Sequence, residues 1–232
     1  MKGSMKKIAI IPAYNEQGSI LKTVNDLREN APDFDYIIIN DCSTDDTQKI
    51  CEENGLHVVS LPVNLGIGGG VQTGYQYAKT HDYDIAVQFD GDGQHNAKFL
   101  DAMADKLVNE DLDMVIGSRY IEKKGFQSSG LRRLGIRYFS WLIRRMTGQT
   151  ITDPTSGMRI CNRDVIEIYA NDYPRDYPEP ESVTTILRVG KKVKEMPVEM
   201  NERTAGVSSI SPRKSIYYMV KVSLAVLMAG KR

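Results

Sequence analysis

The chain has 232 residues, enough for one α/β domain with a substantial core. Its composition is that of an ordinary soluble protein, with 41% hydrophobic residues and 30 Lys and Arg against 30 Asp and Glu. This zero net charge argues against a general nucleic-acid binder. Three cysteines without metal-ligand spacing, together with the lack of a recognisable signal peptide, predict reduced thiols in the cytosol.

The first half of the chain alternates short apolar, β-branched runs with helical patterns. Strands are expected at residues 8–11, 36–39, 58–61, 85–89 and 114–117, and helices at 18–30, 45–54, 68–79 and 97–109. This alternation predicts an α/β fold with a mostly parallel sheet and helices on both faces. Ligands of such sheets bind beyond the carboxyl ends of the strands, where residues 12–16, 40–43 and 90–94 fall.

The second half follows a different pattern. Residues 131–146 predict a basic amphipathic helix, residues 181–189 another helix, residues 194–198 a strand, and residues 211–228 a terminal helix with Pro212 in its first turn. Three prolines between residues 173 and 180 are expected to exclude regular helix there. No linker or repeat interrupts the chain, so we expect a single domain. No run reaches the roughly 18 apolar residues of a membrane-spanning helix.

Two aspartates one residue apart, Asp90 and Asp92, follow the apolar run at residues 85–89. Their carboxylates suit Mg²⁺ or Mn²⁺ held partly by the protein and partly by the phosphates of a substrate. Gly91 and Gly93 would let a large ligand approach the backbone. Taken alone, Asp-x-Asp is a common pattern, and it favours a solvated Asp/Gly turn at the end of the strand.

Other segments accompany this pair in a characteristic order. The segments before it are Pro12-Ala13-Tyr14-Asn15-Glu16, Asn40-Asp41 and the glycine-rich residues 66–74. The segments after it are Gly117-Ser118-Arg119-Tyr120, Asp153-Pro154-Thr155-Ser156-Gly157-Met158-Arg159 and Arg203-Thr204-Ala205-Gly206-Val207-Ser208. As a set they resemble the family 2 glycosyltransferases of the GT-A fold, in the dolichyl- or polyprenyl-phosphate sugar synthase branch. The resemblance covers residues 6–210, nearly the whole chain.

The resemblance implies a GT-A, Rossmann-like domain with a donor half at residues 6–118 and an acceptor half at residues 119–210, followed by a C-terminal amphipathic helix at residues 211–232. The implied activity is an inverting, metal-dependent transfer of a sugar from a UDP- or GDP-sugar to polyprenyl phosphate, for cell-wall or surface polysaccharide synthesis. The implied donor-binding residues are Pro12, Ala13, Tyr14, Glu16, Asp41, Gly68, Asp90 and Gly91. The implied ligands of Mg²⁺ or Mn²⁺ are Asp90, Asp92 and Gln94, and the implied acceptor-binding residues are Arg119, Arg132, Arg203 and Ser208.

Several of these residues have a plainer explanation. Asp41 could begin an Asx turn, and Asp45 is expected to cap the next helix. The glycine-rich segment lacks the Gly-x-Gly-x-x-Gly spacing of dinucleotide sites, so it predicts close helix packing with backbone contact near the donor, or packing alone. Arg132 could be an ordinary surface arginine, because the family usually has serine four residues later, whereas this chain has Ile136.

The identity of the acceptor decides which catalytic residues are needed. A lipid phosphate is already an anion and needs no strong base, whereas a sugar hydroxyl needs a base within about 3 Å. Asp92 is the catalytic candidate that acts through the metal, and Glu181 and Asp153 are the candidate bases. Either of these two carboxylates could instead fix the acceptor loop through an arginine. The alternative functions are therefore a glycosyltransferase with a saccharide hydroxyl acceptor and a non-enzymatic, nucleotide-sugar-binding membrane partner.

Charge also clusters locally. Between residues 119 and 145 there are eight basic residues and one acid, and Tyr217, Tyr218 and Lys221 in the terminal helix suit an interface. These features predict peripheral contact with the cytoplasmic face of the cell membrane. The alternative is that the terminal helix packs on the core or on another subunit. A small membrane partner or a homo-oligomer is also expected, but no nucleic-acid partner.

Overall fold

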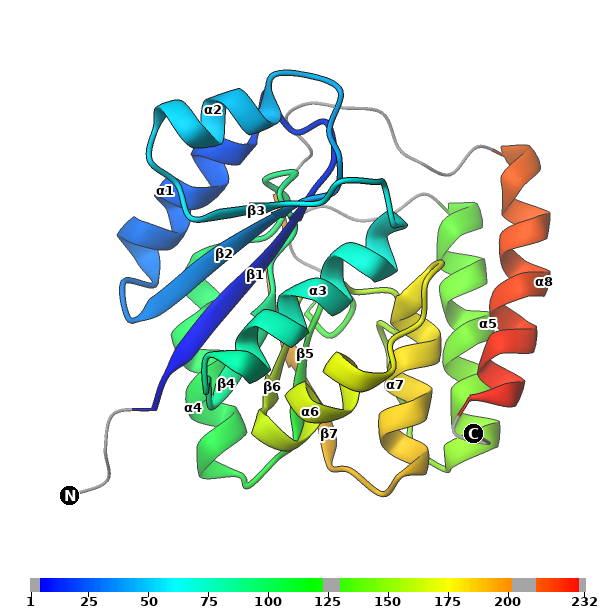
Figure 1. Cartoon of the computed structure of the whole chain (residues 1–232). Helices are drawn as coiled ribbons and strands as arrows, with labels where there is room; N and C mark the ends of the chain where they lie inside the picture. Colours follow the sequence, from blue (N-terminus) through cyan, green and yellow to red (C-terminus); the bar gives the residue numbers. More distant parts are fainter. Residues whose placement is uncertain (1–4, 123–129, 202–211, 230–232) are drawn as a thin grey trace.

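The structure is a computed structural model that describes residues 5–122, 130–201 and 212–229. Its centre is a seven-stranded sheet in the order β3-β2-β1-β4-β6-β5-β7 (Figure 1). The strands are β1 (Lys7–Ala13), β2 (Phe34–Asn40), β3 (Val58–Ser60), β4 (Ile85–Gln88), β5 (Met114–Ser118), β6 (Arg159–Asn162) and β7 (Val193–Pro197). Among these strands only β6 runs antiparallel to its neighbours, β4 and β5. The predicted mostly parallel sheet is confirmed.

Helices cover both faces of the sheet, as the alternating pattern predicted (Figure 1). They are α1 (Ile20–Asn30), α2 (Thr47–Glu53), α3 (Gly66–Thr80), α4 (Leu100–Asn109), α5 (Gly130–Thr147), α6 (Arg163–Asn171), α7 (Pro178–Arg188) and α8 (Pro212–Met228), with a short 3₁₀ turn at Ala97–Phe99 before α4. Helices α1, α2 and α4 share one apolar core with the sheet, and α3 and α5 to α8 share the other. No helix in the described ranges is both long and apolar enough to span a bilayer.

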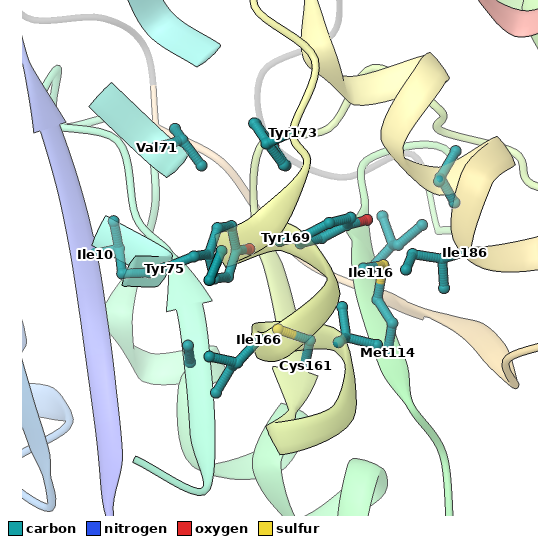
Figure 2. Close-up of a cluster of buried hydrophobic side chains, with 14 of the residues drawn as sticks. Ile10, Val71, Tyr75, Met114, Ile116, Cys161, Ile166, Tyr169, Tyr173 and Ile186 are labelled. Atoms are coloured by element: carbon teal, nitrogen blue, oxygen red, sulfur yellow. The ribbon is translucent and has the colours of Figure 1, made fainter. Parts of the chain in front are cut away.

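Three tyrosines organise the second core (Figure 2). Tyr75 of α3, Tyr169 of α6 and Tyr173 just after α6 are buried, and their ring centroids lie 4.9–5.7 Å apart. Tilted and edge-on contacts of this kind add to the stabilisation that burial of the rings already provides. The cluster therefore fastens α6, and the loop that follows it, against α3.

Two parts of the second half differ from the prediction. Strand β6 and helix α6 were not predicted. The strand is hard to recognise because its four residues, Arg159–Asn162, contain only two apolar side chains and have polar residues at both ends. The expectation that prolines exclude helix up to residue 180 is wrong at its end, since α7 begins at Pro178. Pro178 and Pro180 both lie in the first turn, where backbone N–H groups have no intrahelical acceptor, so they remove no helical hydrogen bond.

Helix α2 begins at Thr47, two residues later than predicted, and Asp46 occupies the N-cap position instead of Asp45. The Asp45 carboxylate still accepts a hydrogen bond from the N–H of Thr47 at 2.9 Å, from one residue further out.

The glycine-rich segment forms the first half of α3 and packs closely on its surroundings. The N–H of Gly68 donates to the carbonyl of Arg175 at 3.1 Å, and a Cβ at Gly68 would lie 2.0 Å from the carbonyl oxygen of Pro174. On the sheet side, a Cβ at Gly74 would lie 2.1 Å from a side-chain carbon of Ile10. These glycines let α3 approach both β1 and the α6–α7 loop, which supports the packing explanation for the segment.

The close approach at Gly68 gives a stability prediction. Replacing Gly68 with Ala should lower the free energy of unfolding by about 1–3 kcal/mol, because the new methyl group meets backbone atoms that must move. Gly70→Ala is the matched control in the same helix, since its Cβ would have Pro12 as its nearest neighbour, at 3.9 Å. Urea unfolding of both variants measures the difference, and equal stabilities would contradict the packing described here.

Candidate active site

The carboxyl ends of β1, β2 and β4 meet at one edge of the sheet, where the ligand site was expected. The N–H of Asp41 donates to the carbonyl of Ala13 at 2.9 Å, and the N–H of Gly91 donates to the carbonyl of Pro12 at 3.3 Å. A Cβ at Gly91 would lie 3.1 Å from that Pro12 oxygen, so glycine allows the loop after β4 to lie against β1. Four of the predicted donor-binding residues are thereby brought together.

Asp41 and Glu16 both have structural partners at this edge. Asp41 is 4% exposed, and its Oδ1 accepts a hydrogen bond from the N–H of Leu65 at 2.7 Å, just before α3. The Glu16 carboxylate accepts from the hydroxyl of Ser19 at 2.6 Å near the start of α1. Tyr14 is 48% exposed beside them. Contacts of these side chains with a base or ribose remain predictions.

The loop after β4 holds its two aspartates differently. Asp90 Oδ1 accepts from the side-chain amide of Gln88 at 2.9 Å, and Asp92 Oδ1 accepts from the N–H of Gln94 at 3.0 Å. His95 is buried, and its Nδ1 accepts a hydrogen bond from the N–H of Asp90 at 3.0 Å. His95 therefore shapes this loop through hydrogen bonding.

The donor set of this loop fits a divalent cation that arrives with a phosphate ligand. The described residues contain no group of three His, Cys, Asp or Glu side chains arranged as metal ligands. Mg²⁺ is commonly held by one or two carboxylates together with substrate phosphates, so Asp90 and Asp92 meet this requirement. A Cβ at Gly157 would lie 2.8 Å from Asp90 Oδ2, so glycine keeps open the space beside this oxygen.

Gly157 owes its position to Arg159, a site residue whose role the sequence reasoning missed. Arg159 is 1% exposed at the start of β6. Its guanidinium donates four hydrogen bonds, to the carbonyls of Ser156, Pro154 and Glu179 and to the hydroxyl of Ser182, all at 2.7–2.8 Å. One buried side chain therefore fixes both the loop before β6 and the first turn of α7.

A second arginine at this edge, Arg119, is paired with Asp153. Arg119 is 7% exposed just after β5, and its Nε and Nη2 donate to the two carboxylate oxygens of Asp153 at 2.7 Å each. Asp153 is fully buried. The geometry supports the second of the two roles considered for Asp153, that of fixing the acceptor loop through an arginine.

Glu195 of β7, which was not among the predicted residues, fixes the backbone that carries Asp153. Its carboxylate accepts from the N–H groups of Thr152 and Asp153 at 2.7 and 2.8 Å and from the Thr152 hydroxyl at 3.0 Å. Burial raises the pKa of Glu195, and the three hydrogen bonds partly oppose this shift. The signal in the sequence that could have identified Glu195 is its charge within a segment predicted to be a strand.

The two glutamates of α7 face different surroundings. Glu181 lines a cavity of about 540 Å³ together with Tyr173, Arg175 and Lys221, on the side where α7 packs against α8. Burial raises the pKa of Glu179, Arg159 and Arg119 lower it, and Asp90 raises it further. Glu179, which was not among the predicted residues, therefore lies within electrostatic reach of Asp90, Arg119 and Arg159.

The predicted acceptor residues are only partly placed. Arg132 is exposed in the first turn of α5, whereas Ile136, where the family usually has serine, is buried. Burial raises the pKa of Tyr218 in α8, the charge of Glu179 adds to this shift, and that of Arg132 opposes it. Arg132 and Glu179 thus lie within electrostatic reach of one hydroxyl. Arg203 and Ser208 lie outside the described residues.

The pair between Arg119 and Asp153 gives a second stability prediction. Asp153→Asn should lower the free energy of unfolding by about 3–5 kcal/mol, because it leaves a buried guanidinium without its counter-charge. Lys192 and Asp111 form a matched surface pair at 2.5 Å, and Asp111→Asn there should cause no measurable change. Chemical unfolding checks both, and an Asp153→Asn protein as stable as the parent would show that the pair contributes nothing.

The chain was compared with known proteins. The model for the glycosyl transferase family 2 matches residues 8–169. The undecaprenyl-phosphate mannosyltransferase of Micrococcus luteus is 30% identical over 216 residues, which cover 89% of this chain and 88% of that protein. The polyprenol monophosphomannose synthase of Mycolicibacterium smegmatis is 27% identical and covers 96% of this chain and 88% of its own length.

Solved structures agree on the fold. The glucosyl-3-phosphoglycerate synthase of Mycobacterium tuberculosis, in complex with Mn²⁺, UDP and phosphoglyceric acid, superposes with a TM-score of 0.71 at 21% identity and covers 99% of this chain and 79% of that one. The sheet with β6 antiparallel, the aspartates after β4 and the match over most of the chain agree in one assignment. The chain belongs to glycosyltransferase family 2, in the branch of the polyprenyl-phosphate sugar synthases, and is a glycosyltransferase.

Proposed function

We propose that this protein is an inverting, metal-dependent glycosyltransferase that moves a sugar from a UDP- or GDP-sugar to polyprenyl phosphate at the cytoplasmic face of the membrane. The observation that carries the proposal is the pair Asp90 and Asp92 at the carboxyl end of β4, at the same edge of the sheet as Asp41 at the end of β2, with β1 between the two strands. The M. luteus and M. smegmatis relatives are named for transfer to a lipid phosphate, which supports the acceptor.

The donor half of the proposal follows from the chemistry of the sheet edge. Asp90 and Asp92, with Gln94 as a further ligand, would hold Mg²⁺ or Mn²⁺ against the diphosphate. The metal, when bound, acts as a Lewis acid on the charge that develops on the leaving nucleotide. Asp41 and Glu16 would accept hydrogen bonds from the base and the ribose, and Pro12 and Ala13 at the end of β1, with Tyr14 just after it, would contact the nucleotide.

The pairing of Asp153, one of the two candidate bases, favours a phosphate acceptor over a hydroxyl acceptor. Asp153 is buried with both oxygens engaged by Arg119, so it is poorly placed to remove a proton from a substrate. A phosphate oxygen needs no such base, and the exposed Arg132 can supply a cation for it. Arg203 and Ser208 complete the acceptor site that the family resemblance implies.

Helices α5 and α8 supply a surface suited to a bilayer. They lie side by side (Figure 1), and the Tyr138 hydroxyl of α5 lies 3.1 Å from that of Ser223 in α8. Their large exposed apolar side chains are Leu134, Tyr138, Trp141, Tyr217, Val220, Leu224, Leu227 and Met228. The exposed arginines of α5 are Arg132, Arg133, Arg137, Arg144 and Arg145. Apolar and cationic side chains together favour the surface of an anionic membrane.

Thermal unfolding with a panel of nucleotide sugars tests the donor half. One UDP- or GDP-sugar should raise the midpoint only when Mg²⁺ or Mn²⁺ is present, since ligand bound to the folded state adds stability. Asp92→Asn should remove most of this metal-dependent shift, whereas Asp105→Asn, an exposed change on α4, should leave it intact. Indifference to every nucleotide with every metal would contradict the proposal.

Transfer of a radiolabelled sugar tests the acceptor half. With polyprenyl phosphate in anionic vesicles, label should appear in a lipid extracted by organic solvent, and no saccharide acceptor should compete. Trp141→Ser combined with Leu224→Ser should weaken vesicle binding about tenfold or more, because two apolar side chains no longer leave water. The double variant should keep its donor-induced thermal shift, and Val108→Ser on α4 should behave as the parent. Label found only on a saccharide would favour the alternative acceptor.

A further inference from the structure

Glu179 shares a rigid frame with the metal-binding loop. Its backbone carbonyl accepts a hydrogen bond from Arg159 Nη1 at 2.7 Å, and another arm of the same guanidinium holds the carbonyl of Pro154 at 2.8 Å. Gly157 follows in this loop and lies against Asp90, with 2.8 Å between Asp90 Oδ2 and the position of an added Cβ. The first turn of α7 is therefore fixed relative to Asp90.

The carboxylate of Glu179 has no direct cationic partner in the described part of the chain. It interacts with the charges of Arg159, Asp90 and Arg119. The four hydrogen bonds of Arg159 go to carbonyls and to a hydroxyl, and Arg119 is bonded to Asp153. Glu179 as a whole is partly buried in the first turn of α7.

The charge of Glu179 limits what it can bind. A phosphate would be repelled by Glu179 and by Asp90 together, whereas a neutral hydroxyl can donate a hydrogen bond to a carboxylate. If the diphosphate of a nucleotide sugar is held at Asp90 and Asp92, the hydroxyl-bearing ring is the part of the donor directly attached to it. Tyr173 and Tyr218 lie within electrostatic reach of Glu179 and bring aromatic rings to the same region.

We propose that Glu179 is a specificity-determining residue that accepts a hydrogen bond from a hydroxyl of the transferred sugar. The proposal rests on the function proposed above, because it requires a nucleotide sugar with its diphosphate at Asp90 and Asp92. A hydrogen bond to a charged acceptor discriminates strongly, since a donor lacking the hydroxyl leaves the carboxylate without a partner.

A cycle of enzyme and substrate changes tests this role. The parent and Glu179→Ala are assayed with the preferred nucleotide sugar and with analogues in which each ring hydroxyl in turn is replaced by hydrogen. For one position, kcat/KM of the parent should fall about ten- to a hundredfold, as expected for a hydrogen bond to a charged group. Glu179→Ala should show a similar loss with the intact sugar and no further loss with that analogue. Glu179→Gln, which keeps an acceptor oxygen, should recover part of the activity.

Controls separate a failure of this proposal from a failure of the proposed function. Binding of UDP or GDP with metal should not weaken in either Glu179 variant, because the free nucleotide has no sugar ring and the variants only remove a negative charge that repels the diphosphate. Glu167→Gln, an exposed change on α6, should leave all parameters unchanged. If the parent accepts a donor and Glu179→Ala loses equally with every analogue, or loses nothing, Glu179 does not bind a sugar hydroxyl. If the parent accepts no donor at all, it is the proposed function that fails.

Discussion

The buried guanidinium of Arg159 is the interaction on which the arrangement of the site depends. A charged side chain that is 1% exposed is stable only if hydrogen bonds replace its lost hydration, and Arg159 has four of them at 2.7–2.8 Å. Three of the acceptors are backbone carbonyls, from two segments that are some 25 residues apart in sequence. The planar fork of arginine can reach these carbonyls at once, whereas the single ammonium group of lysine cannot.

Strand β6 explains why these segments reach the donor edge at all. Because β6 runs antiparallel to β4, its first residue lies at the edge where β4 ends, and Arg159 pairs in register with Gln88. The loop that precedes β6 therefore lies beside the loop that follows β4. A parallel strand in this position would have placed the same loop at the far edge of the sheet, about four residues, or roughly 13 Å, away.

The sequence predicted those parts of the fold that are set by periodic apolar patterns. Strands β1, β2 and β4, whose residues are nearly all buried, could be recognised from their β-branched runs, and with them the edge that carries Asp41, Asp90 and Asp92. Strand β6 could not be recognised, because it is short, has polar residues at both ends, and depends on Arg159, two of whose four hydrogen-bond partners, Glu179 and Ser182, are distant in sequence. The same limit applies to α7, where Glu179 and Glu181 are two positions apart and only tertiary packing decides the surroundings of each.

The charges of the site divide into an acidic donor edge and a more balanced acceptor region. Asp41, Asp90, Asp92 and Glu179 together would repel a diphosphate, since two like charges 4 Å apart cost about 4 kcal/mol at an effective dielectric of 20. A divalent cation would reverse this balance, so the charge distribution supports the proposed metal dependence. On the acceptor side the charge of Arg119 is already matched by Asp153. Arg119 therefore acts mainly as a structural part of the loop. In the proposed function, the attraction of an anionic acceptor would fall to exposed cations such as Arg132, whose long-range field at a membrane surface would be screened by salt.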